Sequence, residues 1–285
     1  MVRRQVNHIT LFLYRIAIVY VLLTITRITF YLFNAGLFPN ISFTDFLTIL
    51  RGGLKFDTAA IIYLNIAFIV MNIIPFRFVY NKVYQQVAKW IYIITNSIGL
   101  LANCADTAYY PFTIKRTTSL VFSQFSNEEN MLSLVGQFLI DWWYMLLLFI
   151  VLVAVLIFLY DRLTLKEPTE NNLKFYSCSA IAMCIVLFLC FGGVRGGFRH
   201  STRPISPADA GEYVKQPNEM AIVQNTPFTL IRTIGKAGLQ RINYFDEKKS
   251  SLLVILDQYF PLIENQIISS NVKNILLFAK KSVFL

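Results

Sequence analysis

The sequence predicts an all-α protein: a polytopic membrane bundle of five transmembrane helices followed by an extracytoplasmic linker. Hydrophobic residues make up 56% of the 285 residues and charged residues only 15%, whereas soluble domains usually carry about 25% charged residues. Five apolar stretches also approach the roughly 20 residues that a helix needs to cross the hydrocarbon core. Helix is the expected geometry because backbone amides cannot stay unpaired in lipid, and the stretches do not alternate like barrel strands.

The five predicted spans cover residues 9–33, 57–76, 87–104, 135–160 and 175–191. A shorter apolar patch at residues 43–50 cannot cross a bilayer, so we expect it to lie at the interface or to re-enter the membrane. The resulting transmembrane domain is predicted over residues 1–194. Its first span is too long for the apolar region of a signal peptide and should remain as an anchor.

The distribution of basic residues predicts the orientation. With a cytoplasmic N-terminus, eight Lys and Arg residues fall in inner segments and four in the outer loops before the fifth span. The inner residues are Arg3, Arg4, Arg77, Lys82, Lys89, Arg162, Lys166 and Lys174, and the outer residues are Arg51, Lys55, Lys115 and Arg116. Short cytoplasmic loops carry an excess of Lys and Arg. We therefore expect a multi-pass protein of the cell (inner) membrane with its C-terminus outside the cytoplasm.

The net charge is +10. The Lys and Arg residues lie mostly between apolar stretches, an arrangement that suits anionic head groups better than DNA. We expect a membrane phospholipid as partner and no nucleic acid.

The composition changes after the fifth span, and residues 195–245 are predicted to form the extracytoplasmic linker. Gly and Pro are frequent up to residue 218, which is typical of loop. Ser206 and Pro207 could cap and begin a short helix. Residues 221–244 have an apolar side and a basic side, so we expect a helix lying on the membrane surface.

Charged residues near the predicted outer surface are the first candidates for a site: Arg27, Asp57, Asp106 and Asp141. A charge in hydrocarbon costs about 3 kcal/mol or more, so such groups are usually paired or functional. One interpretation is a site for a lipid head group, since the planar arginine side chain suits phosphate. The predicted rim of that site is Arg51, Lys55, Lys115 and Arg116. The other interpretation is that these charges pair with one another or extend to the interface.

The second candidate is the glycine-rich stretch at residues 192–199, GGVRGGFR, which contains Arg195 and Arg199 and is followed by Arg203. Glycines allow backbone amides to converge on an anion. A flexible exit from the membrane whose basic residues meet head groups explains the stretch as well. Arg15, near the inner surface, is expected to extend along its helix to the interface.

Signatures of soluble enzymes are absent from the sequence, which contains no GxxxxGK[ST], GxGxxG, HExxH or GxSxG motif. Only two histidines occur, which argues against a His-based triad or a His-rich metal site. The four cysteines form no CxxC pair and are expected to be buried as small apolar residues. We therefore predict no catalytic residue and no metal ligand in this chain.

Several motifs in a fixed order resemble a known family. They are KFDTAA at residues 55–60, DTAYY at 106–110, KRTT at 115–118, RGG at 195–197 and RPI at 203–205. With the five-helix plan, these motifs make residues 10–245 similar to the membrane half of lipoteichoic acid synthase-like proteins. These proteins belong to the sulfatase and alkaline-phosphatase superfamily of phosphoglycerol and phosphoethanolamine transferases.

The resemblance implies a second, extracytoplasmic α/β domain that binds a divalent metal, often manganese, and carries a threonine nucleophile. Residues 246–285 resemble only the start of that domain, with residues 273–278 as its first strand. Lys281 and Ser282 stand where the family has a metal-binding glutamate followed by serine. A truncated transferase is therefore expected, inactive alone, with a separate chain supplying the catalytic domain as one possibility.

Two other functions stay open. The chain could be a non-catalytic membrane binding or scaffold protein, or a component of a transporter or flippase. Transporters often contain internal repeats and helices broken near the midplane. The sequence shows no repeat, and Pro75 lies at the end of a span.

Overall fold

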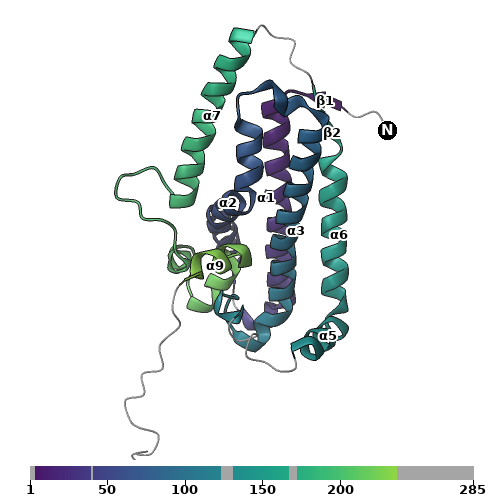
Figure 1. Ribbon diagram of the computed structural model, residues 1–285. Helices are drawn as coiled ribbons and strands as arrows, with labels where there is room; N and C mark the ends of the chain where they lie inside the picture. Colours follow the sequence, from purple (N-terminus) through teal and green to yellow (C-terminus); the bar gives the residue numbers. More distant parts are fainter. Residues whose placement is uncertain (1–3, 40, 123–130, 167–171, 236–285) are drawn as a thin grey trace, which may run out of the picture. The chain divides into compact units, whose positions relative to one another are not determined.

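The computed structural model describes residues 4–39, 41–122, 131–166 and 172–235 and is mostly helical (Figure 1). The α-helices are α1 (His8–Phe33), α2 (Phe43–Ile73), α3 (Lys82–Thr113), α5 (Met131–Asp141), α6 (Trp143–Tyr160), α7 (Asn172–Arg195), α8 (Met220–Val223) and α9 (Thr226–Thr233). Short 3₁₀ helices are η1 (Ala35–Leu37), η2 (Arg77–Tyr80), η3 (Pro207–Tyr213) and η4 (Pro217–Glu219). Strand in these ranges is limited to β1 (Arg4–Val6) and β2 (Leu163–Leu165).

Four helices of the described part are long and apolar enough to cross a membrane: α1, α2, α6 and, from Phe175, α7. The predicted all-helical membrane architecture is confirmed to that extent. The third predicted span corresponds to α3, a helix of 32 residues that packs against α1, α2 and α6. It carries more polar side chains than the other four, so its crossing remains a prediction.

Two boundaries differ from the sequence prediction. The patch at residues 43–50 is the first part of the long helix α2, and it is not a separate interfacial piece. The fourth predicted span divides into α5 and α6 at Trp142, whose backbone leaves the helical region (φ −116°, ψ 33°). Asp141 therefore ends α5 and does not lie in the turns of a transmembrane helix.

The core of the bundle lies between α1, α2, α3 and α6. Phe68 of α2 packs on Tyr92 of α3 with ring centroids 4.8 Å apart, and Leu156 of α6 is fully buried in the same cluster. Asn65 and Asn96 exchange reciprocal amide hydrogen bonds of 3.0 and 2.7 Å between α2 and α3. Asn65 also marks a kink in α2, where the backbone is non-helical.

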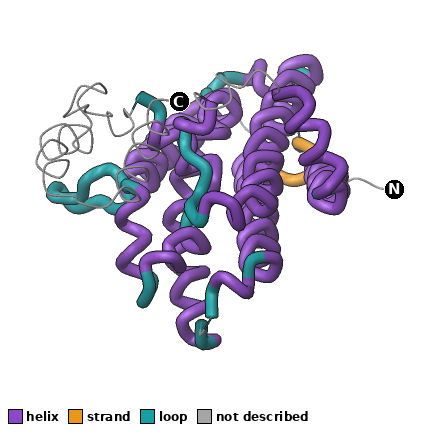
Figure 2. Tube along the Cα trace, turned by 90° about the horizontal axis from the view of Figure 1, so that it is seen from below, coloured by secondary structure: helices purple, strands orange, loops and turns teal. Residues whose placement is uncertain are grey.

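The two short strands bring distant parts of the chain to one end of the bundle. Residues 4–6 pair in parallel with residues 163–165, so the segment before α1 and the segment after α6 lie side by side (Figure 1). Helices α8 and α9 lie toward the other end of the bundle (Figure 1). Figure 2 shows the molecule from below, that is, from this second end.

Helix α7 packs along α2, where Gly193 lies against Ile62 and Thr58. Most of its remaining surface is exposed. The expectation that the cysteines are buried is therefore wrong for Cys178 and Cys184, which are exposed on α7, and correct for Cys104 of α3.

The chain after α7 folds back on the bundle. The predicted helix start at Ser206 and Pro207 is confirmed as η3, with the Ser206 amide donating to the Asp209 carboxylate at 2.7 Å. The single surface helix predicted at residues 221–244 is wrong. Gln224 and Asn225 have extended backbone that separates α8 from α9, and Ile222, Val223 and Phe228 are fully buried. Residues 236–285, including the predicted first strand at 273–278, lie outside the described part.

Candidate functional site

Two buried ion pairs lie at the end of the bundle that carries α8 and α9. One joins Arg27 to Asp57 and the other joins Arg116 to Asp106. The other ion pairs among the described residues each include a partly or fully exposed partner. Both arginines also donate to backbone carbonyls of residues 221–224. We call residues 220–233 the docking segment, because these bonds attach it to the bundle.

Arg27 links α1 to α2 and to the docking segment. Its two terminal nitrogens, Nη1 and Nη2, donate to the Asp57 carboxylate at 2.6 and 2.7 Å, which is the bidentate geometry that makes such pairs strong. Nε donates to the Ile222 carbonyl at 2.9 Å, and Nη2 donates to the Val223 carbonyl at 3.1 Å. Arg27 and Asp57 are 2% and 0% exposed, so this guanidinium is enclosed by the protein itself.

Gly53 of α2 makes this arrangement possible. The Arg27 side chain crosses α2 directly over Gly53, and a Cβ at that position would lie 2.6 Å from Arg27 Nε. Real Cβ contacts are never that short. The glycine therefore supplies the space for the guanidinium beside the backbone of α2.

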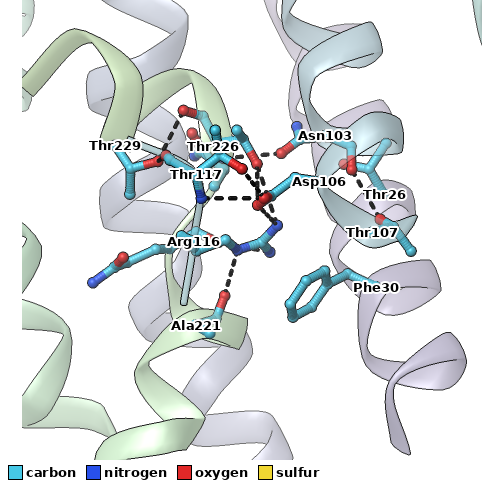
Figure 3. A network of polar contacts seen from close by, with 12 residues as sticks. Thr26, Phe30, Asn103, Asp106, Thr107, Arg116, Thr117, Ala221, Thr226 and Thr229 are labelled. Atoms are coloured by element: carbon cyan, nitrogen blue, oxygen red, sulfur yellow. Dashed lines mark hydrogen bonds and ion pairs between the residues drawn. The ribbon is translucent and has the colours of Figure 1, made fainter. Parts of the chain in front are cut away.

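Asp106, near the end of α3, is the centre of the second cluster (Figure 3). Arg116 Nη1 donates to it at 3.0 Å, and Thr226 Oγ1 donates at 2.8 Å. The Thr117 amide donates at 3.1 Å, and the Thr117 hydroxyl also donates to the same carboxylate. A carboxylate with so many donors is fully satisfied, so it stabilises the turn after α3 as well as the docking segment.

Arg116 follows α3 and extends into the docking segment. Nε donates to the Ala221 carbonyl at 2.7 Å and Nη2 to the Gln224 carbonyl at 3.1 Å. The guanidinium carbon lies 3.6 Å from the centre of the Phe30 ring, a cation–π contact with α1. Burial lowers the pKa of Arg116, while the Asp106 charge opposes that shift. Arginine nevertheless stays charged near neutral pH.

The docking segment has its own local signal in the sequence. Asn225 caps α9 by accepting from the Phe228 amide at 2.9 Å, and Pro227 lies in the first turn. The Asn225 side-chain amide also donates to Asp57 at 2.7 Å. The Thr226 amide donates to Asn103 of α3 at 3.0 Å. One capping turn is therefore joined to both α2 and α3.

The structure thus brings together Arg27, Asp57, Asp106 and Arg116, and leaves the other candidates outside this network. Arg116 is not at an exposed rim as predicted but is 5% exposed, because the docking segment covers it. Lys115, Arg51 and Asp141 are exposed. The prediction that Arg15 extends to the interface is wrong: it is 5% exposed and lies 3.8 Å over the Tyr160 ring.

The glycine-rich stretch ends α7 at Arg195 and continues as a turn beside α2. Gly196 has φ +74°, a left-handed backbone conformation that favours glycine, and it lies against Lys55 and Ile205. Arg195 Nε donates to the Thr202 carbonyl at 3.1 Å and closes the turn. Arg199 and Arg203 are exposed. Lys55 also lies 3.8 Å from Glu212. We call Lys55 with residues 195–203 the basic turn.

Sequence reasoning missed the partners that come from the docking segment and the threonines around Asp106. Asn225-Thr226-Pro227 is a helix-start signature that could have revealed the break between α8 and α9. The backbone carbonyls of residues 221–224 carry no sequence signal at all. Within the described residues, no three His, Cys, Asp or Glu side chains come together as a metal site would require.

Comparison with known proteins adds no relative: no family model, no curated protein and no solved structure matches this chain.

Proposed function

We propose that this chain is the membrane module of an envelope transferase of the lipoteichoic acid synthase-like kind, inactive without a catalytic domain. One observation carries the proposal. The motifs that suggested the resemblance lie far apart in the sequence, yet they meet at one end of the bundle. Asp57 comes from the first motif, and Asp106 and Arg116 come from the next two. Gly196 and Ile205, from the last two, lie in contact beside Lys55.

The module would hold the chain that follows α9 at a fixed point of the membrane face. The docking segment is attached to α1, α2 and the end of α3 by buried charged groups, so its position is determined by the bundle. A catalytic domain, on the same chain or a partner chain, could then approach lipid from a defined position. The divalent metal and the threonine nucleophile that the resemblance implies would belong to that domain.

The basic turn is the proposed site for the phospholipid head group. Arg27 and Arg116 are enclosed and have donated most of their N–H groups to the protein, so they suit a structural role. Arg199 and Arg203 are exposed on a turn that begins directly after an apolar helix. Exposed arginines at that depth can bind a phosphate from the bilayer.

Five crossings with a cytoplasmic N-terminus complete the proposal, and the faces of α3 support them. Its exposed side is apolar, with Trp90, Ile94, Ile98 and Leu101, while Asn96, Asn103 and Asp106 are buried. A helix with its polar groups inward and apolar groups outward suits lipid surroundings. The test is to label single cysteines with a membrane-impermeant maleimide in intact cells, in a chain without its native cysteines. Arg199→Cys should be labelled and Gln5→Cys should not. Labelling of Gln5→Cys but not Arg199→Cys would refute this orientation.

The head-group proposal is tested by binding. The purified chain in nanodiscs should bind phosphatidylglycerol or phosphatidylethanolamine, and Arg199→Gln with Arg203→Gln should weaken binding roughly thirtyfold, from the loss of two charges. Arg162→Gln, an exposed arginine after α6, is the matched control and should bind like the unmodified chain. Unchanged binding in the double variant would favour the alternative, a scaffold without a head-group site. Appreciable turnover of labelled phosphatidylglycerol with a divalent metal would contradict the proposed inactivity of this module.

A further inference from the structure

A cavity of about 330 Å³ lies at the end of the bundle opposite the docking segment. Its walls are formed by the start of α1, the end of α2, η2 with Phe76 before it, and the first half of α7, together with Lys166 directly after β2. Its volume is within the usual range of small-molecule sites, about 300–1,000 Å³. None of the residues argued above for the docking segment or the basic turn lines it, so it is a separate feature.

The cavity is elongated along α7. Its α7 wall is formed by Phe175, Cys178, Ser179, Ala182, Met183 and Val186. These residues recur every three or four positions and therefore share one face of the helix. At 1.5 Å per residue, Phe175 to Val186 spans about 16 Å. Half of a hydrocarbon core about 30 Å thick has nearly that length, so the slot is as long as one lipid leaflet is deep.

The chemistry of the lining changes along this slot. Phe12 of α1 and Met183 and Val186 of α7 line its apolar part. Asn7, His8 and Lys166 lie at the end of the slot where α1 begins, beside β1 and β2. His8 Nε2 is buried and has no hydrogen-bond partner among the described residues. An amphipathic occupant would meet apolar walls with its chain and polar groups with its head.

Charge favours an anionic head group. Among the described residues that line the cavity, Lys166 carries a positive charge and none is Asp or Glu. The Arg77 guanidinium lies 5.6 Å from the Phe175 ring at the same end. Basic pockets between transmembrane helices bind anionic lipid head groups. The outer face of α7 beside the slot is exposed and apolar, with Ile181, Ile185 and Phe188, so a lipid chain can enter from the side.

We propose that this slot binds an anionic phospholipid, with one acyl chain between α1 and α7 and its phosphate at Lys166 and His8. This second lipid site is independent of the basic turn. It would fill the gap beside α7 and hold that helix against α1.

The test uses phosphatidylglycerol titrated into the full chain in detergent, with native mass spectrometry to count bound lipids and obtain Kd. Arg199→Gln with Arg203→Gln serves as background, so that the basic turn does not contribute. Ala182→Trp should fill the slot and remove one bound lipid, whereas Ile181→Trp, on the exposed face of the same turn, should not. Lys166→Glu should weaken binding roughly thirtyfold from a two-unit charge change. Arg162→Glu should leave it unchanged.

Circular dichroism and the thermal midpoint check that each variant is folded, and Lys166 is exposed enough for its substitution to be tolerated. Equal phosphatidylglycerol binding by Ala182→Trp and Ile181→Trp would overturn the proposal. So would equal affinity for phosphatidylcholine, which shows that no anion is recognised. Displacement of the lipid by millimolar inorganic phosphate would assign the site to a free anion and overturn the lipid assignment.

Discussion

Arg116→Met should release the docking segment while leaving the bundle folded. The substitution removes the ion pair with Asp106 and two charge-assisted bonds that hold the segment, to the carbonyls of Ala221 and Gln224. Each such bond contributes about 1.5–3 kcal/mol. Asp106 loses its cationic partner but keeps neutral donors from Thr117 and Thr226, which still solvate its charge. The free energy that holds the docking segment on the bundle should fall by about 3 kcal/mol, which raises the population of the open segment about 150-fold.

Hydrogen exchange measured by mass spectrometry in nanodiscs reports this opening directly. Backbone amides of residues 220–233 should exchange about two orders of magnitude faster in Arg116→Met, and amides of α1 and α2 should keep their rates. Lys115→Met, the exposed neighbour outside the network, is the control and should exchange like the unmodified chain. If the segment exchanges at the same rate in both variants, Arg116 does not hold it and the reasoning fails.

Substitutions of Arg27, Asp57 and Gly53 test the Arg27 cluster. Arg27→Met should destabilise the bundle by about 3–5 kcal/mol because Asp57 is left as a buried charge, and adding Asp57→Leu should recover most of that loss in denaturant unfolding. Gly53→Ala should cost about 1–3 kcal/mol in the same assay, since its Cβ would overlap Arg27 beside a fixed backbone. Gly36→Ala, with nothing within 4 Å, should stay within 0.5 kcal/mol of the unmodified chain. An equal loss in the two glycine variants would rule out the overlap as the cause.

The helices could be predicted because their signal is apolar length. Four of the five predicted spans correspond to helices that can cross a membrane by length and composition. The errors occurred where polar groups decide the outcome. The apolar patch before Asp57 looked too short to be a span, yet it continues into α2 through Gly52 and Gly53, which lie under Tyr213 and Arg27. Glycines that would weaken an isolated helix instead allow close packing on it.

The charged cluster was predictable in composition but not in arrangement. Depth alone placed Arg27 near Asp57 and Asp106, since charges in hydrocarbon need partners. Which acid pairs with which arginine depends on how the helices face each other, and no periodicity contains that information. The covering of Arg116 by residues 221–224 depends on backbone carbonyls, which every sequence has. An exposed rim was therefore the natural prediction for a residue that the docking segment buries.

The two ends of the bundle have opposite physical characters, and this difference separates the two lipid proposals. At the docking end, α1, α2 and the turn after α3 are joined through residues 221–226 by buried charged bonds, so relative movement of these helices would leave charges unpaired. At the other end, the cavity between α1 and α7 is bounded largely by apolar side chains, which can separate without that cost. A lipid in the slot would therefore alter the position of α7 without loosening the docking segment. Exchange rates of residues 220–233 should be unchanged by Ala182→Trp, even where that variant loses its lipid.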